Sequence, residues 1–108
     1  MITQINDRKL EELLLDSNIP LCITFFEYDS NTCKNLMPEL HEAAKQLNDI
    51  MRFYTVNTTE NERATRELKV NSVPTMIIYR EGNEIARYDG VHRAEALVKQ
   101  FTSDIKED

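Results

Sequence analysis

Hydrophobic residues recur along the chain with two periods, one typical of helices and one typical of strands. The spacing of Leu10, Leu13 and Leu14 places them on one face of a predicted helix that ends near residues 17–18. The run Leu21–Phe26 is apolar except for Thr24, which is typical of a central strand covered on both faces. Related patterns predict strands over residues 2–5, 51–56, 74–79 and 84–88, and helices over 36–47, 59–69 and 93–104.

The order of these elements predicts the fold class. Strands that are joined by helices favour parallel pairing, whereas the turn at residues 80–83 favours an antiparallel hairpin. We therefore expect an α/β fold with a mixed central sheet and helices on both faces. A chain of 108 residues is large enough for one core, so residues 1–108 are predicted to form a single domain. Thr59 and Glu62 have the spacing of a capping box at the start of the third helix.

The segment after the central strand carries the candidate chemistry. The string Cys33-Lys34-x-Leu36-x-Pro38 resembles the active-site loop and first helical turns of thioredoxin, and Val73-Pro74-Thr75 resembles the segment whose proline is cis in that family. Further matches to the family, spread over nearly the whole chain, are Phe25, Phe26, Asn57, Gly82 and Gly90. The resemblance implies a thioredoxin fold and a relation to thiol–disulfide oxidoreductases.

One residue departs from the chemistry that the resemblance implies. The family's attacking cysteine aligns with Ser30 and its resolving cysteine with Cys33, which gives a Ser-x-x-Cys motif. Disulfide exchange needs a thiolate, and a serine hydroxyl does not attack a disulfide at physiological pH. The family's buried carboxylate aligns with Thr24, its partner lysine with Thr55, and the tryptophan before the motif with Asp29. We therefore expect impaired dithiol exchange, with at most monothiol chemistry at Cys33.

Two roles stay open for each residue of the motif. Ser30 either caps the second helix through its side-chain oxygen or presents a functional hydroxyl to Cys33 or to a ligand. A serine engineered in place of a reactive cysteine would have the same consequence. Cys33 is either a slow monothiol, favoured by the helix dipole, or an inert packed thiol, favoured by burial.

The resemblance also implies a binding groove formed by Val73, Pro74, Thr75 and Gly90. An extended peptide would bind there by main-chain hydrogen bonds, so a non-catalytic peptide-binding module is the alternative function. The expected partners are protein or peptide thiols and disulfides, glutathione or a reductase. A glutathione-linked or iron–sulfur monothiol protein is disfavoured, because such relatives keep the first cysteine of the motif.

Composition narrows the class of protein further. The net charge is −6 and no segment concentrates Lys or Arg, which disfavours nucleic-acid binding. The N-terminus lacks a signal-peptide pattern, and no apolar run approaches the length of a membrane span.

Cys22 and Cys33 are separated by too much of the central strand to form a disulfide. His41 and His92 lack metal-ligand spacing. We expect a cytoplasmic monomer without a metal or cofactor.

Overall fold

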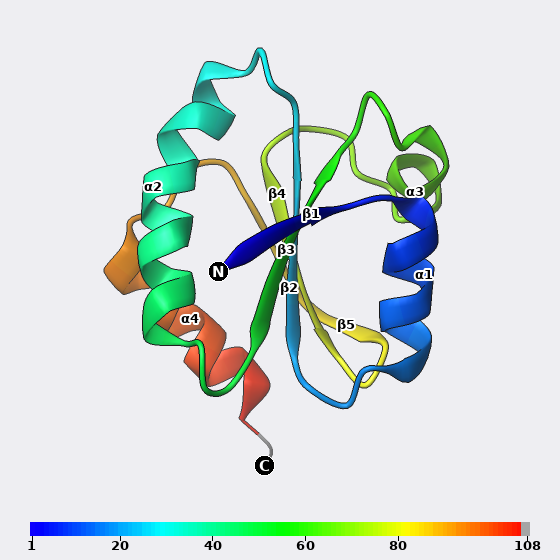
Figure 1. Cartoon of the computed structure of the whole chain (residues 1–108). Coiled ribbons are helices and arrows are strands. Elements are labelled where there is room, and N and C mark those ends of the chain that lie inside the picture. Colours follow the sequence, from blue (N-terminus) through cyan, green and yellow to red (C-terminus); the bar gives the residue numbers. More distant parts are fainter. Residues whose placement is uncertain (107–108) are drawn as a thin grey trace.

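The computed structural model describes residues 1–106, and its elements follow the predicted order (Figure 1). The elements are β1 (Ile2–Ile5), α1 (Asp7–Asp16), β2 (Leu21–Phe26), α2 (Asn31–Gln46), β3 (Arg52–Asn57), α3 (Glu62–Glu67), β4 (Thr75–Arg80), β5 (Asn83–Asp89) and α4 (Ala94–Ile105). None of the helices within residues 1–106 is long and apolar enough to cross a membrane.

The five strands form one mixed sheet in the order β1-β3-β2-β4-β5. β3 pairs in parallel with β1 and β2, whereas β4 pairs antiparallel with β2 and β5. Helices α2 and α4 cover one face of the sheet, and α1 and α3 cover the other (Figure 1). The predicted mixed sheet between two helical layers is therefore confirmed.

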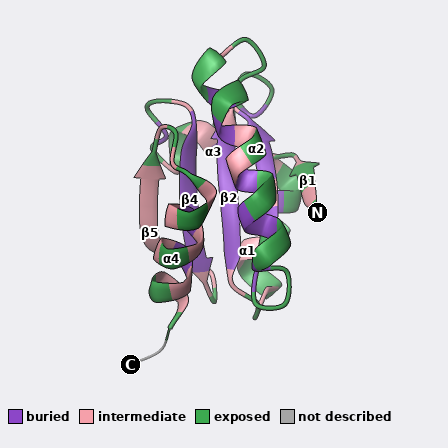
Figure 2. Ribbon diagram, turned by 90° about the vertical axis from the view of Figure 1, so that its left-hand side faces the viewer, coloured by how far each residue is buried: buried purple, intermediate pink, exposed green. Residues whose placement is uncertain are grey.

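Strand β2 contributes to both cores, because its side chains alternate between the two faces of the sheet. Cys22 belongs to the cluster shared with α2 and α4, whereas Ile23 and Phe25 belong to the cluster shared with α1 and α3. These three side chains are fully buried, and Figure 2 shows β2 and β4 buried along most of their length. Burial on both faces explains why the sequence of β2 lacks the alternation of a half-exposed strand.

The predicted capping box at α3 is wrong. The helix is preceded by Asn61, not Thr59, and Asn61 makes no side-chain cap to α3 itself. Instead, the Asp7 carboxylate at the start of α1 accepts a hydrogen bond from the N–H of Ala64 at 3.2 Å. The Asn61 side-chain oxygen in turn accepts from the N–H of Asp7 at 2.9 Å. The N-termini of α1 and α3 therefore cap each other, an arrangement that the local sequence does not encode.

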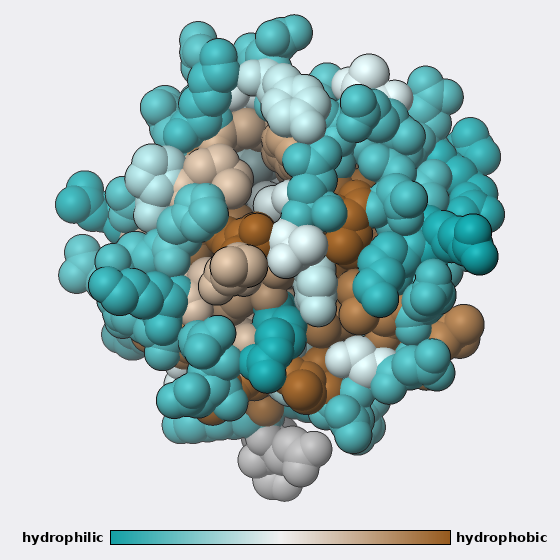
Figure 3. Space-filling model, in the orientation of Figure 1, coloured by the Kyte–Doolittle hydropathy of each residue, from teal (hydrophilic) through white to brown (hydrophobic). Residues whose placement is uncertain are grey.

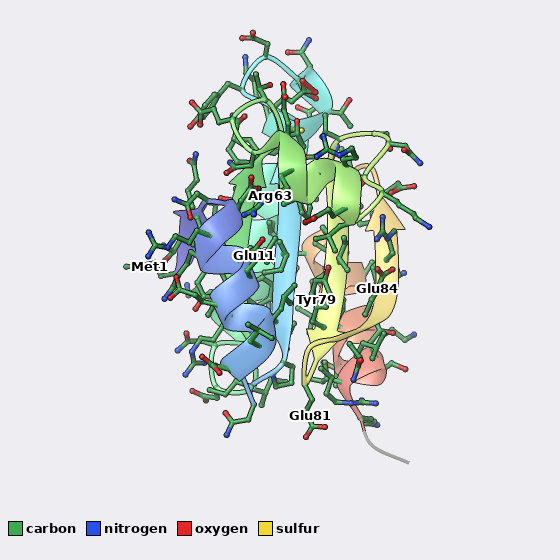
Figure 4. All side chains as sticks on the ribbon, turned by 90° about the vertical axis from the view of Figure 1, so that its right-hand side faces the viewer. Met1, Glu11, Arg63, Tyr79, Glu81 and Glu84 are labelled. Carbon is green, nitrogen blue, oxygen red and sulfur yellow. The ribbon has the colours of Figure 1, made fainter. Side chains whose placement is uncertain are left out.

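Side chains also tie neighbouring helices together at the surface. Arg63 of α3 lies 2.8 Å from the carboxylate of Glu11 on α1 (Figure 4), and both side chains are about half exposed. An exposed pair of this kind contributes little to stability, about 0–1 kcal/mol. On the other face, Glu39 of α2 accepts a hydrogen bond at 2.8 Å from the N–H of Ala94, in the first turn of α4. This carboxylate at a helix N-terminus aligns α4 with α2.

Arg87 joins strand β5 to the end of helix α3. Its guanidinium donates to the carbonyls of Leu68 at 2.8 Å and Lys69 at 3.1 Å, and it pairs with Glu84 at 2.7 Å. Tyr79 on β4 pairs with Glu84 across the two strands (Figure 4). Burial, together with the nearby charge of Glu84, raises the pKa of Tyr79 to about 12. The hydroxyl of Tyr79 has no hydrogen-bond partner within the described residues.

The β4–β5 hairpin turns through two residues with positive φ, Glu81 at 52° and Gly82 at 81°. Two successive positive φ values are typical of the type I′ turn, whose twist matches that of the strands. Gly82 also lies against α1, since a Cβ at this position would be 2.5 Å from the carbonyl oxygen of Leu14. Gly82 is therefore required both by its φ and by the close approach of the helix backbone.

Gly82→Ala is predicted to lower the free energy of unfolding by about 2 kcal/mol or more, because it adds both backbone strain and a clash. Gly90→Ala is the matched control, since Gly90 has a similar φ of 79° but a Cβ at this position would have no neighbouring atom within 4 Å. That control should cost about 1 kcal/mol, from strain alone. Urea unfolding of both variants measures the difference. Equal losses would show that the contact with Leu14 is unimportant.

Candidate functional site

Ser30 precedes helix α2 and caps it. Its backbone is extended, with φ −85° and ψ 118°, and its side-chain oxygen accepts a hydrogen bond from the N–H of Cys33 at 3.1 Å. Its carbonyl accepts from the N–H of Lys34 at 3.1 Å. The capping role predicted for Ser30 is therefore present. The side-chain oxygen thereby satisfies one free donor of the helix.

Cys33 lies in the first turn of α2 and is only 2% exposed. Cys22 is completely buried in β2, and both cysteines are free. Burial raises the pKa of the Cys22 thiol to about 12, while a contact at 3.8 Å between its sulfur and the Thr24 hydroxyl opposes the shift. Cys22 is therefore a packing residue without redox chemistry at neutral pH, and Cys33 is the candidate thiol.

The interior beneath the loop carries hydroxyl groups where the resemblance would place charges. Thr24 and Thr55 are register partners on β2 and β3, and they are 0% and 5% exposed. They occupy the positions that the resemblance assigns to a buried carboxylate and a lysine. Neither hydroxyl ionises near neutral pH, so this pair cannot act as a general base for the thiol in place of a carboxylate.

Strand pairing brings the second predicted segment to the same end of the sheet. Thr75, the first residue of β4, lies opposite Phe25 near the end of β2. Val73 and Pro74 therefore adjoin the start of the β2–α2 loop, which lies at the top of Figure 1. The Val73–Pro74 peptide bond is cis. The sheet thus places the motif of Ser30 and the segment of Pro74 side by side.

The main chain around Val73 is partly free. The carbonyl of Pro74 accepts a hydrogen bond from the N–H of Gly90 at 3.0 Å. Within residues 1–106, by contrast, neither the N–H nor the carbonyl of Val73 takes part in a hydrogen bond. The Val73 side chain is half-buried. The main-chain groups of Val73 can therefore pair with an added extended segment.

Thr75 supports this segment from below. It is 2% exposed, and its hydroxyl lies 2.7 Å from the carbonyl of Ser72 and 3.0 Å from the carboxylate of Asp89. These contacts tie the end of β5 to the residues before β4. Thr75 is buried, as is Pro74 before it, and its hydrogen bonds hold the segment in place. The substrate contact that the resemblance implied for Thr75 stays a prediction.

Hollows adjoin the loop on the α3 side. One, of about 150 Å³, is lined by Glu27, Thr58, Thr65, Val70, Asn71, Ser72 and Val73. Another, of about 180 Å³, is lined by Glu27, Tyr28, Asp29, Asn57, Thr59 and Glu60. Neither hollow is lined by Ser30 or Cys33. Sequence reasoning missed these surfaces because their residues come from separate loops, and the only signal was a group of acids near the ends of predicted strands.

Among residues 1–106, no group of three His, Cys, Asp or Glu side chains is placed to hold a metal ion. Figure 3 shows that the end of the molecule carrying the β2–α2 loop, at the top of the view, is mainly hydrophilic on this face. The site thus offers the shielded thiol of Cys33, the unpaired main-chain groups of Val73 and a hydrophilic surface around the β2–α2 loop.

Comparisons with known proteins identify the family. The family model described as Thioredoxin matches residues 1–103. The chain is 24% identical over 105 residues to thioredoxin from Rickettsia bellii, with 97% of this chain and 100% of the relative covered. It is 30% identical over 100 residues to protein disulfide-isomerase A3 from Gallus gallus, covering 93% of this chain and 20% of that protein.

Solved structures agree on the fold. The crystal structure of chloroplastic thioredoxin z superimposes with a TM-score of 0.87 at 19% identity, covering 95% of this chain and 93% of the other. The X-ray structure of Fasciola hepatica thioredoxin gives a TM-score of 0.84 at 24% identity, covering 96% and 99%. The expected thioredoxin fold is therefore confirmed.

Ser30→Ala is predicted to lower the free energy of unfolding by about 1 kcal/mol, because the N–H of Cys33 loses its acceptor. Ser30→Asp is the matched control, since its carboxylate can accept the same hydrogen bond at the helix N-terminus. Urea unfolding in the presence of a reductant measures both. An unchanged Ser30→Ala protein, or equal loss in both variants, would contradict the capping role.

Proposed function

Since this chain belongs to the thioredoxin family, we propose that it is a relative of the thiol–disulfide oxidoreductases in which dithiol exchange is impaired. The observation that carries the proposal is the hydrogen bond from the N–H of Cys33 to the side-chain oxygen of Ser30. The scaffold holds oxygen at the position where the exchange reaction requires sulfur. The family's fold is retained, and its first chemical step is lost.

The chemistry that this residue set supports is a monothiol reaction. A thiolate at Cys33 attacks one sulfur of a client disulfide, forms a mixed disulfide and releases the other sulfur as a thiolate. Cys22, the other cysteine of the chain, is buried within β2 and does not resolve the adduct. Release therefore requires an external thiol, such as glutathione, a reductase or a second thiol of the client. The 2% exposure of Cys33 makes the first step slow.

A non-catalytic peptide-binding module is the second candidate, and it too has a specific observation in its favour. The Val73 main chain is unpaired beside the motif, whereas Cys33 is shielded. An extended peptide could therefore bind at Val73 without any sulfur chemistry. In this case Pro74 and Gly90 shape the groove, and Cys33 serves only the packing of α2.

We also propose a reducing compartment, the cytoplasm, and a role in thiol homeostasis as a monomer. The two free cysteines support the compartment, since oxidising compartments favour paired cysteines. The acidic balance of 19 Asp and Glu residues against 13 Lys and Arg residues supports protein rather than nucleic-acid partners.

Reduction of insulin disulfides with dithiothreitol tests the loss of dithiol exchange. The unmodified protein is predicted to show no acceleration over dithiothreitol alone, and Ser30→Cys to accelerate the reaction by at least about tenfold, because it restores the attacking thiol. Ser30→Ala controls for loss of the cap and should stay at background. Turnover by the unmodified protein would refute the proposal. An inactive but folded Ser30→Cys would implicate Thr24, Thr55 and Asp29 as further obstacles.

Alkylation of the folded protein by iodoacetamide at pH 8 separates the two candidates. We expect slow labelling at Cys33, because this residue is 2% exposed, and none at Cys22, whose pKa is about 12. Cys33→Ala should abolish the labelling, and Cys22→Ala should preserve it. If the native protein resists labelling and unfolded protein accepts it at both cysteines, the monothiol reaction is excluded and the binding module stands.

A further inference from the structure

Three exposed carboxylates gather around one hollow beside the β2–α2 loop. Glu27, Asp29 and Glu60 line it together with the aromatic side chain of Tyr28. Within the described part of the chain, none of the three carboxylates lies within 4.0 Å of a basic side chain. The hollow therefore presents three carboxylates that form no ion pair within the described residues.

The aromatic ring that lines this hollow is suited to contact with a basic side chain. Tyr28 is 57% exposed, and its ring packs edge-on against Phe26, with the ring centroids 5.2 Å apart. Its hydroxyl is held by hydrogen bonds with Gln4 at 2.9 and 3.2 Å. Tyr28 is thus fixed in place while part of its surface stays accessible. Carboxylates beside an aromatic ring attract the cationic end of Lys or Arg and pack against its aliphatic stem.

The acidic hollow adjoins a second hollow that Val73 lines. Glu27 lines both hollows. A segment whose main chain pairs with Val73 and continues past Glu27 brings its side chains to the acidic hollow. Two independent features, free main-chain groups and acidic side chains without an ion pair, therefore lie in neighbouring parts of the surface.

A third hollow has a different balance of charge. This hollow, of about 540 Å³, shares Thr58, Thr65, Val70 and Asn71 with the hollow that Val73 lines, and it is also lined by Arg66, Lys69 and Glu62. It carries two basic groups and one carboxylate, whereas the Tyr28 hollow carries three carboxylates and no basic group. The Tyr28 hollow therefore attracts a basic side chain more strongly.

We propose that this trough, defined by Glu27, Tyr28, Asp29, Glu60 and Val73, binds an extended basic segment of a partner protein. The segment pairs with the Val73 main chain and places a Lys or Arg side chain between the three carboxylates. The inference rests on the proposed function, because it names the partner chemistry of the same groove. The inference applies to a client protein whose disulfide is flanked by basic residues. It applies equally to a basic peptide that binds without any sulfur chemistry.

Titration of ¹⁵N-labelled protein with synthetic peptides tests the proposal. The probes are three otherwise identical eight-residue peptides of Ser, Thr and Val that carry two Lys, two Gln or two Glu residues. We expect amide shifts at Val73 and at residues 27–29, with the Lys peptide bound about 3- to 10-fold more tightly than the Gln peptide and the Glu peptide more weakly than either. The preference should shrink when salt is raised from about 20 to 200 mM.

Matched variants separate the trough from the overall negative charge of the chain. Glu27→Gln, Asp29→Asn and Glu60→Gln combined should remove the preference for Lys. Glu12→Gln, Asp16→Asn and Asp49→Asn combined remove the same charge from exposed positions away from the trough and should preserve it. Circular dichroism verifies that both variants are folded. A preference that survives the first set, or that is lost in both, overturns the proposal.

The outcomes also distinguish this inference from the proposed function. If the three peptides shift the Val73 amide with equal affinity, the groove binds peptide but the basic preference is wrong. If the shifts map outside Val73 and residues 27–29, or none occur with any peptide, the trough is not the binding surface. In that case the insulin and alkylation results decide whether Cys33 chemistry still stands.

Discussion

Burial of strand β2 on both faces is the constraint on which the rest of this structure depends. Its side chains enter two separate cores, so a helical layer must cover each face of the sheet. The register of β2 with β3 and β4 then fixes which loops meet at its carboxyl end. The motif of Ser30 and the segment of Pro74 come together there, although more than 40 residues separate them in the sequence.

The proposed loss of dithiol exchange depends on the atom at residue 30. The oxygen of Ser30 accepts a backbone hydrogen bond and stabilises the start of α2, whereas the resemblance to the family would place a sulfur there. Cys33 keeps its place one turn into the helix but is shielded from solvent. The groups that remain accessible are the main chain of Val73 and the carboxylates of the acidic hollow beside Tyr28. Under the proposed function, these accessible groups serve recognition of a partner.

Local patterns predicted the order of the elements, the two-sided burial of β2 and the cap at Ser30, because each depends on residues close together in the sequence. The cap of α3 was mispredicted because its acceptor, Asp7, comes from another helix and is invisible to a local motif. The link from Arg87 to the end of α3 and the trough beside Tyr28 were missed for the same reason. The contact of Thr75 with Asp89 was likewise not predicted, because Asp89 belongs to another strand.

The threonine pair beneath the loop has a consequence for how the site responds to its surroundings. Within residues 1–106 no Asp, Glu, Lys, Arg or His side chain is buried, and the interior below Ser30 holds the hydroxyls of Thr24 and Thr55. A shift of one pH unit around neutrality therefore leaves the charge of this threonine pair unchanged. Any such environmental sensitivity must reside in Cys33, in the exposed groups around the loop or in the partner that docks there.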